Sequence, residues 1–428
     1  MTALDRNPAV APLGARLALI VLVPFAAGYF MSYLYRNINA VVGRYLIDEL
    51  GLSGADIGLL TAAYFLTFAA AQIPIGILLD RFGPRRVNSV LFCVAAAGAV
   101  LFSFGHDRNM LMLARVLIGL GVAGALMSSF QAITLWYPKE RWALFNSVIM
   151  IVGGLGAVAG TGPVEAALTL TDWRGLFLVL AVATIGVAAL IFFVVPERAR
   201  NFRDRTVVPE SLGAVIKGVG KVLGHPALWS MAPVIFFCQA ANLAILTLWG
   251  GLWLRDVAGL DRADSAIFLG LANIGLTAGF VLNAVAGEIA ARRKIPLERV
   301  ITVLTVSFLV AQALIVFRVD PGAAWPWIVF GIFANAAIFC YPLLAGRLPV
   351  AYSGRANTSA NFIAFSGAFL GQYLIGWVMD FFPRQPNGSY AGAAYDWAFG
   401  GILALEILGL LWFLYAYGRT LPPAPKAQ

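Results

Sequence analysis

The chain has 428 residues, of which 61% are hydrophobic and only 12% are charged, and its mean hydropathy is +0.84. This apolar share exceeds what the core of a soluble domain buries, so the composition excludes an ordinary water-soluble protein. A formal net charge of +9 is found in nucleic-acid-binding proteins and also in membrane proteins with basic loops. Because the apolar runs favour the second class, we expect no nucleic-acid partner.

Long apolar segments follow one another from end to end. A helix crosses a hydrocarbon layer of about 30 Å with about 20 apolar residues, and these segments are apolar on every face, whereas the strands of a membrane barrel would alternate. The sequence predicts an all-α integral membrane protein with twelve transmembrane helices. They are expected at approximately Leu17–Val42, Gly54–Leu79, Val87–Phe104, Met110–Trp136, Trp142–Leu168, Gly175–Val195, Leu228–Leu254, Ser265–Ile289, Val300–Phe317, Ala323–Leu344, Ala356–Phe381 and Trp397–Tyr417.

The distribution of basic residues predicts the topology. Most of the 30 Lys and Arg residues fall on one side of the expected spans, which is the side of both termini. Loops rich in Lys and Arg stay in the cytoplasm. We therefore expect cytoplasmic N- and C-termini and a multi-pass, monomeric protein embedded in the lipid of a bacterial-type inner (plasma) membrane.

A polar interval after residue 195 separates six spans from six. We expect a cytoplasmic tail at 1–16, a six-helix bundle at 17–195, a cytoplasmic linker at 196–227, a second six-helix bundle at 228–418 and a cytoplasmic tail at 419–428. Arg141 and Gly153 recur half a chain length later as Arg355 and Gly367, which favours an internal duplication. Two such halves with a site between them are typical of secondary transporters, which expose that site to each side in turn.

The cysteine and histidine residues are not spaced as in a disulfide, a metal site or a catalytic site. Cys93, Cys238 and Cys340 lie in expected spans without C-x-x-C spacing, and His106 and His225 lie in loops. This pattern predicts no disulfide, no metal site and no cofactor. It also lacks a nucleophile with a base beside it, so we do not expect an enzyme.

The segment GILLDRFGPRR, residues 76–86, lies between the second and third spans. It resembles the loop signature G-x-L-a-D-r-x-G-x-r-r of the major facilitator superfamily. Arg115-x3-Gly119-x-Gly121, Trp173-Arg174 and Gly354-Arg355-Ala356 are similar to further motifs of that family, so the resemblance covers the whole chain. It implies two pseudo-symmetric six-helix bundles and a cytoplasmic gate, with a turn at Gly83 and Pro84. The expected gate residues are Gly76, Asp80, Arg81, Gly83, Arg85 and Arg86, of which Asp80 and Arg81 form the lock and the last two anchor the loop to lipid.

Two arginines lie inside expected spans, where a charge is costly and usually faces a wet cavity or a partner. Arg36 ends the first span and Arg115 begins the fourth, so both lie at similar depth. Two guanidinium groups at one level can hold a carboxylate through bidentate hydrogen bonds. The alternative is that Arg36 extends to the lipid headgroups while Arg115 binds helix carbonyl groups.

The segments SYLYRNINAVV and LIDELGLSGADIGLL are similar to the organic anion symporter branch of the same family. That resemblance implies that Arg36 and Arg115 bind the substrate anion. The branch often carries an acid directly before the first arginine and another two turns after the second, where this chain has Tyr35 and Val122.

Proton coupling is therefore assigned to other buried acids. Glu165 follows a Gly-Thr-Gly-Pro break in the fifth span, and Glu406 lies in the twelfth. Burial favours the protonated form of such groups, which makes Glu165 the first candidate and leaves Glu406 as a candidate or a packing residue. If neither takes up a proton, exchange or facilitated diffusion replaces symport.

The predicted function is secondary active transport of a small organic anion of the carboxylate type by alternating access, with proton-linked symport. The alternatives are a proton-coupled drug or metabolite efflux antiporter and a receptor that uses the same fold without transport. The expected substrate-binding residues are Arg36, Arg115, Tyr33, Asn37, Tyr64, Gln131, Gln239, Asn242, Asn273, Asn335 and Asn361.

Overall fold

The computed structural model describes residues 15–137, 141–196, 212–349 and 353–419. Within these ranges the chain is helical and contains no strand. Twelve segments are long and apolar enough to cross a membrane, which confirms the predicted fold class. The helices are α1 (Ala15–Asn37), α2 (Asn39–Leu50), α3 (Gly54–Ser103), α4 (Arg108–Val122), α5 (Ala125–Trp136), α6 (Trp142–Ala159), α7 (Gly162–Leu168), α8 (Trp173–Val194), α9 (Leu212–Leu223), α10 (Pro226–Ala244), η3 (Ile245–Trp249), α11 (Gly250–Asp256), α12 (Arg262–Arg292), α13 (Leu297–Val316), α14 (Trp325–Phe333), η4 (Ala336–Phe339), α15 (Cys340–Ala345), α16 (Ser353–Met379) and α17 (Gly392–Arg419).

Local sequence signals explain where several helices begin and end. At the start of α3, Ser53 Oγ accepts the backbone N–H of Asp56, and the Asp56 carboxylate accepts the N–H of Ser53, which is a reciprocal capping box. Inside α3 the backbone leaves the helix at Gly83, whose φ of 77° suits glycine, so two spans are joined by the expected turn.

Two elements differ from the sequence expectation. The first span ends at Asn37, and the residues after it form the separate helix α2, which stops at Gly51 in the left-handed conformation. The expected linker at 196–227 contains the helix α9. The start of α2 continues the apolar pattern of the first span, and α9, with 12 residues, is too short to cross a membrane.

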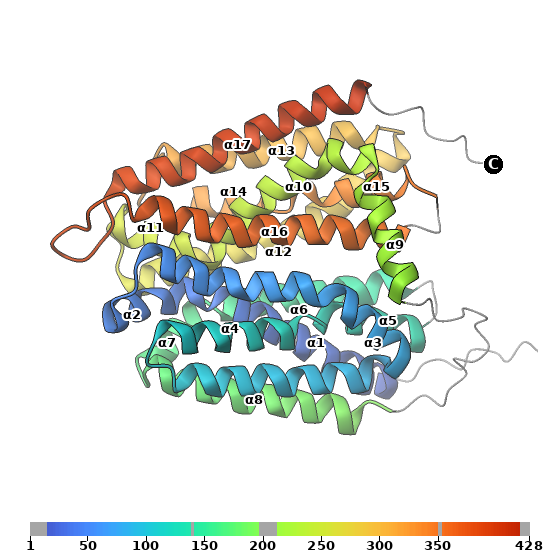
Figure 1. The fold of residues 1–428 in the computed structure, drawn as a ribbon, viewed down its shortest axis with the longest axis horizontal. Coiled ribbons are helices and arrows are strands. Elements are labelled where there is room, and N and C mark those ends of the chain that lie inside the picture. The colour runs from blue at the N-terminus through green and yellow to red at the C-terminus, as the bar shows by residue number, and fades with distance from the viewer. Residues whose placement is uncertain (1–14, 138–140, 197–211, 350–352, 420–428) are drawn as a thin grey trace, which may run out of the picture.

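The two halves of the chain lie against each other along their length (Figure 1). In the middle, α3 of the first half and α16 of the second half run side by side. One end of the molecule carries α2, α11 and the loop after α16, and we name it the α2 end. The other end carries α9, the beginning of α1 and the end of α17, and we name it the α9 end (Figure 1). In the predicted topology, the α9 end faces the cytoplasm.

The α2 end is closed by bonds between the halves. Gly54 and Ala55 at the start of α3 donate their backbone N–H groups to the two carboxylate oxygens of Asp380, both at 2.7 Å. Arg384 donates to the carbonyl of Leu52 at 2.7 Å. A Cβ atom on Gly58 would lie 2.5 Å from the carbonyl oxygen of Gln372, so only glycine allows α3 and α16 to approach this closely.

Helix α2 is also tied to its own half. The Glu49 carboxylate accepts Trp173 Nε1–H at 2.6 Å and Arg174 Nη1–H at 2.5 Å. Partial burial alone would raise the pKa of Glu49, but these two donors outweigh it and lower that pKa below its usual value. Glu49 therefore stays ionised and holds α2 against the start of α8.

Candidate functional site

A pocket lies between the halves, at the point where α1 faces α10 and η3. The first half contributes Tyr33, Arg36 and Asn37 from α1. About 30 Å³ of it is open to the centre of a water molecule, which is room for about two waters. A larger ligand therefore needs the walls to move apart. The second half contributes Gln239, Asn242, Leu243, Leu246, Thr247, Leu276 and Asn335.

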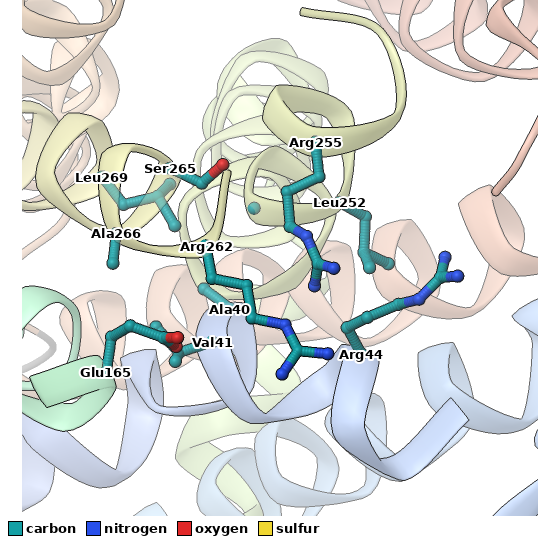
Figure 2. Close-up of a pocket in the computed structure, with 11 residues that line it drawn as sticks. Ala40, Val41, Arg44, Glu165, Leu252, Arg255, Arg262, Ser265, Ala266 and Leu269 are labelled. Carbon is teal, nitrogen blue, oxygen red and sulfur yellow. The ribbon is translucent and has the colours of Figure 1, made fainter. Parts of the chain in front are cut away.

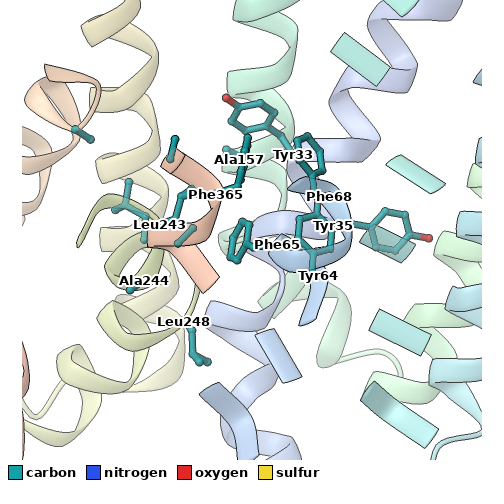
Figure 3. Packing of buried hydrophobic residues seen from close by; sticks show 14 of the residues in the cluster. Tyr33, Tyr35, Tyr64, Phe65, Phe68, Ala157, Leu243, Ala244, Leu248 and Phe365 are labelled. Carbon is teal, nitrogen blue, oxygen red and sulfur yellow. The ribbon is translucent and has the colours of Figure 1, made fainter. Parts of the chain in front are cut away.

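Arg36 is the charged group of this pocket. Its side chain is enclosed by aromatic rings: the guanidinium carbon lies 4.5 Å from the ring centre of Tyr33, 5.1 Å from Phe68 and 5.7 Å from Phe365. Such cation–π contacts stabilise the charge without using its hydrogen-bond donors. Arg36 is 8% exposed, and its Nε has no hydrogen-bond partner within the described chain. Figure 3 shows Phe365 of α16 facing the rings of Phe65 and Phe68, which belong to α3.

Neutral polar groups of the pocket are also left without partners. Among the described residues, Asn242 Oδ1 and Asn335 Nδ2 are buried and make no hydrogen bond, whereas Asn37 Nδ2 donates to the carbonyl of Tyr33 at 2.9 Å. A buried polar atom without a partner costs about 1 to 3 kcal/mol. The pocket therefore favours a ligand that both donates and accepts hydrogen bonds besides carrying a negative charge.

Arg115 lies elsewhere, on the side of α1 that faces away from the pocket. Its Nη1 donates to the carbonyl of Tyr35 at 3.1 Å, and its guanidinium carbon lies 5.0 Å from the ring of Phe102 and 5.8 Å from Phe177. Figure 3 shows the Tyr35 ring turned away from Phe68. Arg115 is 1% exposed, with Nε and Nη2 unpartnered among the described atoms. This conformation matches the alternative in which Arg115 binds a helix carbonyl, and it does not bring the two arginines together.

The other expected binding residues are spread over the interface. Tyr64 lies near Arg36 and donates its hydroxyl to the carbonyl of Ser32 at 3.2 Å. Asn273 donates to its own helix at the carbonyl of Leu269, and Asn361 accepts the hydroxyl of Tyr341 at 2.7 Å. Gln131 is half-buried in α5. Six of the eleven expected residues line the Arg36 pocket, namely Tyr33, Arg36, Asn37, Gln239, Asn242 and Asn335.

The two candidate acids have different surroundings. Glu165 in α7 accepts the hydroxyl of Tyr45 at 3.2 Å and lines a second pocket, at the α2 end. Burial and the adjacent Glu165 carboxylate raise the pKa of Tyr45, so its hydroxyl remains the donor. Glu406 in α17 is 1% exposed, and neither of its oxygens has a partner within the described chain. Glu165 thus lies at the interface of the halves, and Glu406 lies inside the second half.

The expected gate residues occupy the α9 end of the first half. A Cβ atom on Gly76 would meet no atom within 4 Å. Arg81 is exposed and lies 5.2 Å from the ring of Phe82, and Arg85 donates to the carbonyl of Phe192 in α8 at 2.7 Å. Arg86 is exposed, and the side chain of Asp80 lies outside the described residues. Arg85 therefore makes a contact within its own half, which the expected lipid anchor did not include.

Several residues around these pockets carried no signal in the sequence. Phe68 and Phe365 are ordinary apolar residues of long spans, and only the fold brings them to Arg36. The arginines of the second pocket are Arg44, Arg255 and Arg262. They lie near the ends of spans, where the sequence suggests only loop charges.

Twelve candidate spans among the described residues, arranged in two halves with a charged polar pocket between them, are typical of secondary transporters. The Major Facilitator Superfamily profile matches residues 25–372, and the chain belongs to that superfamily.

Relatives within the superfamily support the resemblance to its organic anion branch. A putative tartrate transporter of Agrobacterium vitis is 23% identical, with 94% of each chain covered. The hexuronate transporter of Escherichia coli K12 is 22% identical over 76% of this chain and 78% of its own. A probable sulfoacetate transporter of Cupriavidus necator is 25% identical over 62% of this chain, and the match spans only 63% of that relative's length.

Solved structures show the same fold. A bacterial homologue of the human lysosomal transporter Spinster, in an inward-facing and occupied conformation, superposes with a TM-score of 0.70 at 17% identity, over 94% of this chain and 98% of that one. The nucleoside transporter NupG, as its D323A mutant, gives a TM-score of 0.72 at 13% identity, over 93% and 100%.

Proposed function

We propose that this protein carries a small carboxylate anion across the membrane by alternating access, with the anion bound at Arg36. The observation that carries the proposal is the position of Arg36 between the halves, where aromatic rings hold its charge and its Nε remains free to donate within the described chain. The names of the relatives, which refer to tartrate, hexuronate and sulfoacetate, support the same class of substrate.

The test is uptake into proteoliposomes of labelled tartrate, with galactonate, glucuronate and sulfoacetate as further substrates. Arg36→Ala should lower uptake of the anion that the parent transports by at least about tenfold, because a hydrogen bond to a charged group contributes about 1.5 to 3 kcal/mol. Arg318→Ala is the matched control, since Arg318 pairs with Asp396 at 2.7 Å within the second half. Equal uptake by the Arg36→Ala and parent proteins would refute the proposal.

We further infer that transport is proton-linked symport and that Glu165 takes up the proton. A coupling acid needs surroundings that change between the two conformations. Glu165 meets this condition because its pocket is shared by α2 and α7 of the first half with α11 and α12 of the second. Glu406 is surrounded by its own half, since α17 packs against α10, α13 and α16, so its neighbours stay the same when the halves move apart.

Two assays distinguish the roles of Glu165 and Glu406: the pH dependence of uptake, and the exchange of labelled for unlabelled anion. Glu165→Gln should abolish the acceleration of uptake by an acidic exterior while exchange of labelled for unlabelled anion continues. Glu406→Gln should leave the response to pH unchanged, because Glu406 keeps the same neighbours in both conformations. A normal pH response in Glu165→Gln would exclude this residue as the coupling site.

A further inference from the structure

The second pocket is lined by three arginines, Arg44, Arg255 and Arg262, and by the carboxylate of Glu165. It lies at the α2 end, where α11 and α12 of the second half meet α2 and α7 of the first half. Figure 2 shows the guanidinium groups of Arg255 and Arg262 reaching toward each other, whereas that of Arg44 points to the opposite side. Arg255 has neither a hydrogen bond nor an ion pair within the described part of the chain.

The first half covers these two arginines in the present conformation. The ring of Tyr45 on α2 lies 4.3 Å from the guanidinium carbon of Arg262, and Asp48 lies 3.9 Å from Arg262 Nη2. Asp48 is shared, because it also pairs with Arg44 Nε at 2.8 Å. Arg262 thus shares its acidic partner with Arg44, and that partner belongs to the half that moves away when this end opens.

Asp256, next to Arg255 in the sequence, has other partners in this conformation. Asp256 Oδ2 already accepts the backbone N–H of Tyr390 at 3.0 Å and the hydroxyl of Tyr395 at 2.8 Å. Its Oδ1 lies 3.7 Å from Arg44 Nη1, which belongs to the first half. When the halves separate here, Arg255 and Arg262 stay together on the second half, and Arg262 loses the carboxylate of Asp48.

A further polar group of the pocket lacks a partner. Ser265 lines it from the first turns of α12, is 3% exposed, and its Oγ makes no hydrogen bond to any described residue. Two guanidinium groups and a hydroxyl can together donate to both oxygens of a carboxylate. In this closed conformation only about 10 Å³ is open to the centre of a water molecule, so the site is collapsed.

We propose that Arg255 and Arg262, with Ser265, form a second binding site for small carboxylate anions, which α2 covers when the α2 end is closed and which is free when that end opens. The site rests on the proposed function only in taking the same class of anion. An anion that binds the open state alone shifts the protein toward that state. In the predicted topology, the substrate itself would then favour opening of the side from which it arrives.

The test measures binding in the full-length Arg36→Ala protein, whose first site is disabled. Tartrate should still raise the midpoint of thermal unfolding in a saturable way, whereas erythritol, which has the same carbon chain without carboxylates, should not. Adding Arg255→Gln and Arg262→Gln should raise the half-saturating tartrate concentration at least about tenfold. Arg318→Gln in the same background is the matched control and should leave that concentration unchanged.

A second measurement follows the opening of this end. Leu248 is fully buried, and its side chain lies toward Gly43 of α2, so a cysteine there reacts with a maleimide when α2 moves away. Tartrate should speed the labelling of Leu248→Cys in Arg36→Ala, and it should not do so after Arg255→Gln, which removes a group without a bonded partner and is therefore expected to fold.

Two results would overturn the second site: no saturable effect of tartrate in Arg36→Ala, or the same half-saturation with and without Arg255 and Arg262. Failure of the proposed function looks different. In that case, Arg36→Ala and the parent protein show the same tartrate uptake, whatever happens at Arg255.

Discussion

Asp380 is expected to hold the α2 end closed, and Asp380→Asn should loosen it. The carboxylate accepts two N–H groups at the start of α3, where the helix dipole also favours a negative charge. The amide keeps one acceptor oxygen and turns an N–H group toward the second donor, so one bond and the charge are lost. Hydrogen bonds to buried charges contribute about 1.5 to 3 kcal/mol, but Asp380 is exposed, and solvent screening reduces its contribution to about 1 kcal/mol.

A change of this size should raise the ratio of open to closed molecules about fivefold. The assay is the rate of maleimide labelling of Leu248→Cys in a protein whose three native cysteines are replaced, because labelling follows the open fraction when opening is fast. Asp396→Asn is the control: Asp396 lies at the same end but pairs with Arg318 of its own half. An unchanged labelling rate in Asp380→Asn would refute the assignment of Asp380 to closure.

Three further changes test the interface, the exposed carboxylate of Glu49 and the buried guanidinium of Arg115. Gly58→Ala should speed labelling of the same reporter by about tenfold, because overpacking costs about 1 to 3 kcal/mol, while Gly76→Ala, which meets open space, should not. Glu49→Gln should lower the midpoint of thermal unfolding at pH 7, because the ionised Glu49 carboxylate stabilises the fold fully above about pH 4.3. At a pH below the lowered pKa of Glu49, the carboxylate is protonated in the folded protein, so the variant and the parent should unfold at the same midpoint. Arg115→Met should leave that midpoint unchanged or raise it, because a buried guanidinium with unpartnered nitrogens is costly; a large fall would contradict this.

Most of the fold could be predicted from composition and hydropathy. The twelve spans were predictable because a membrane imposes a length and an apolar composition on each helix, whatever its neighbours are. The helix α2 was not separated from the first span, since Asn39–Leu50 continues the apolar pattern past the break after Asn37. Helix ends of this kind depend on one or two backbone angles, which the pattern does not encode.

For the pocket, the sequence predicts the depth of each arginine in the membrane but not the direction of its side chain. Arg36 and Arg115 were placed at one level, and charge alone suggested that they act together. The direction in which each side chain leaves its helix depends on how α1 packs against α5, α6 and α8, so Arg115 meets the carbonyl of Tyr35 and the ring of Phe102 instead. The role of Arg115 in binding the substrate stays a prediction for another conformation.

One helix connects the Arg36 pocket to the closure of the α2 end. Phe365 of α16 lies against Phe68 at 4.6 Å between ring centres and covers Arg36 from the second half. The same helix presents the Gln372 carbonyl to α3 and leads into Asp380, which binds the start of α3. Because Phe365 and Gln372 lie on one continuous helix, we expect a movement of α16 away from α3 at the α2 end to shift Phe365 relative to Arg36 as well. In the proposed function, an anion that displaces Phe365 from Arg36 would therefore act on the same contacts that Asp380 maintains, and this would link binding to the opening of the α2 end.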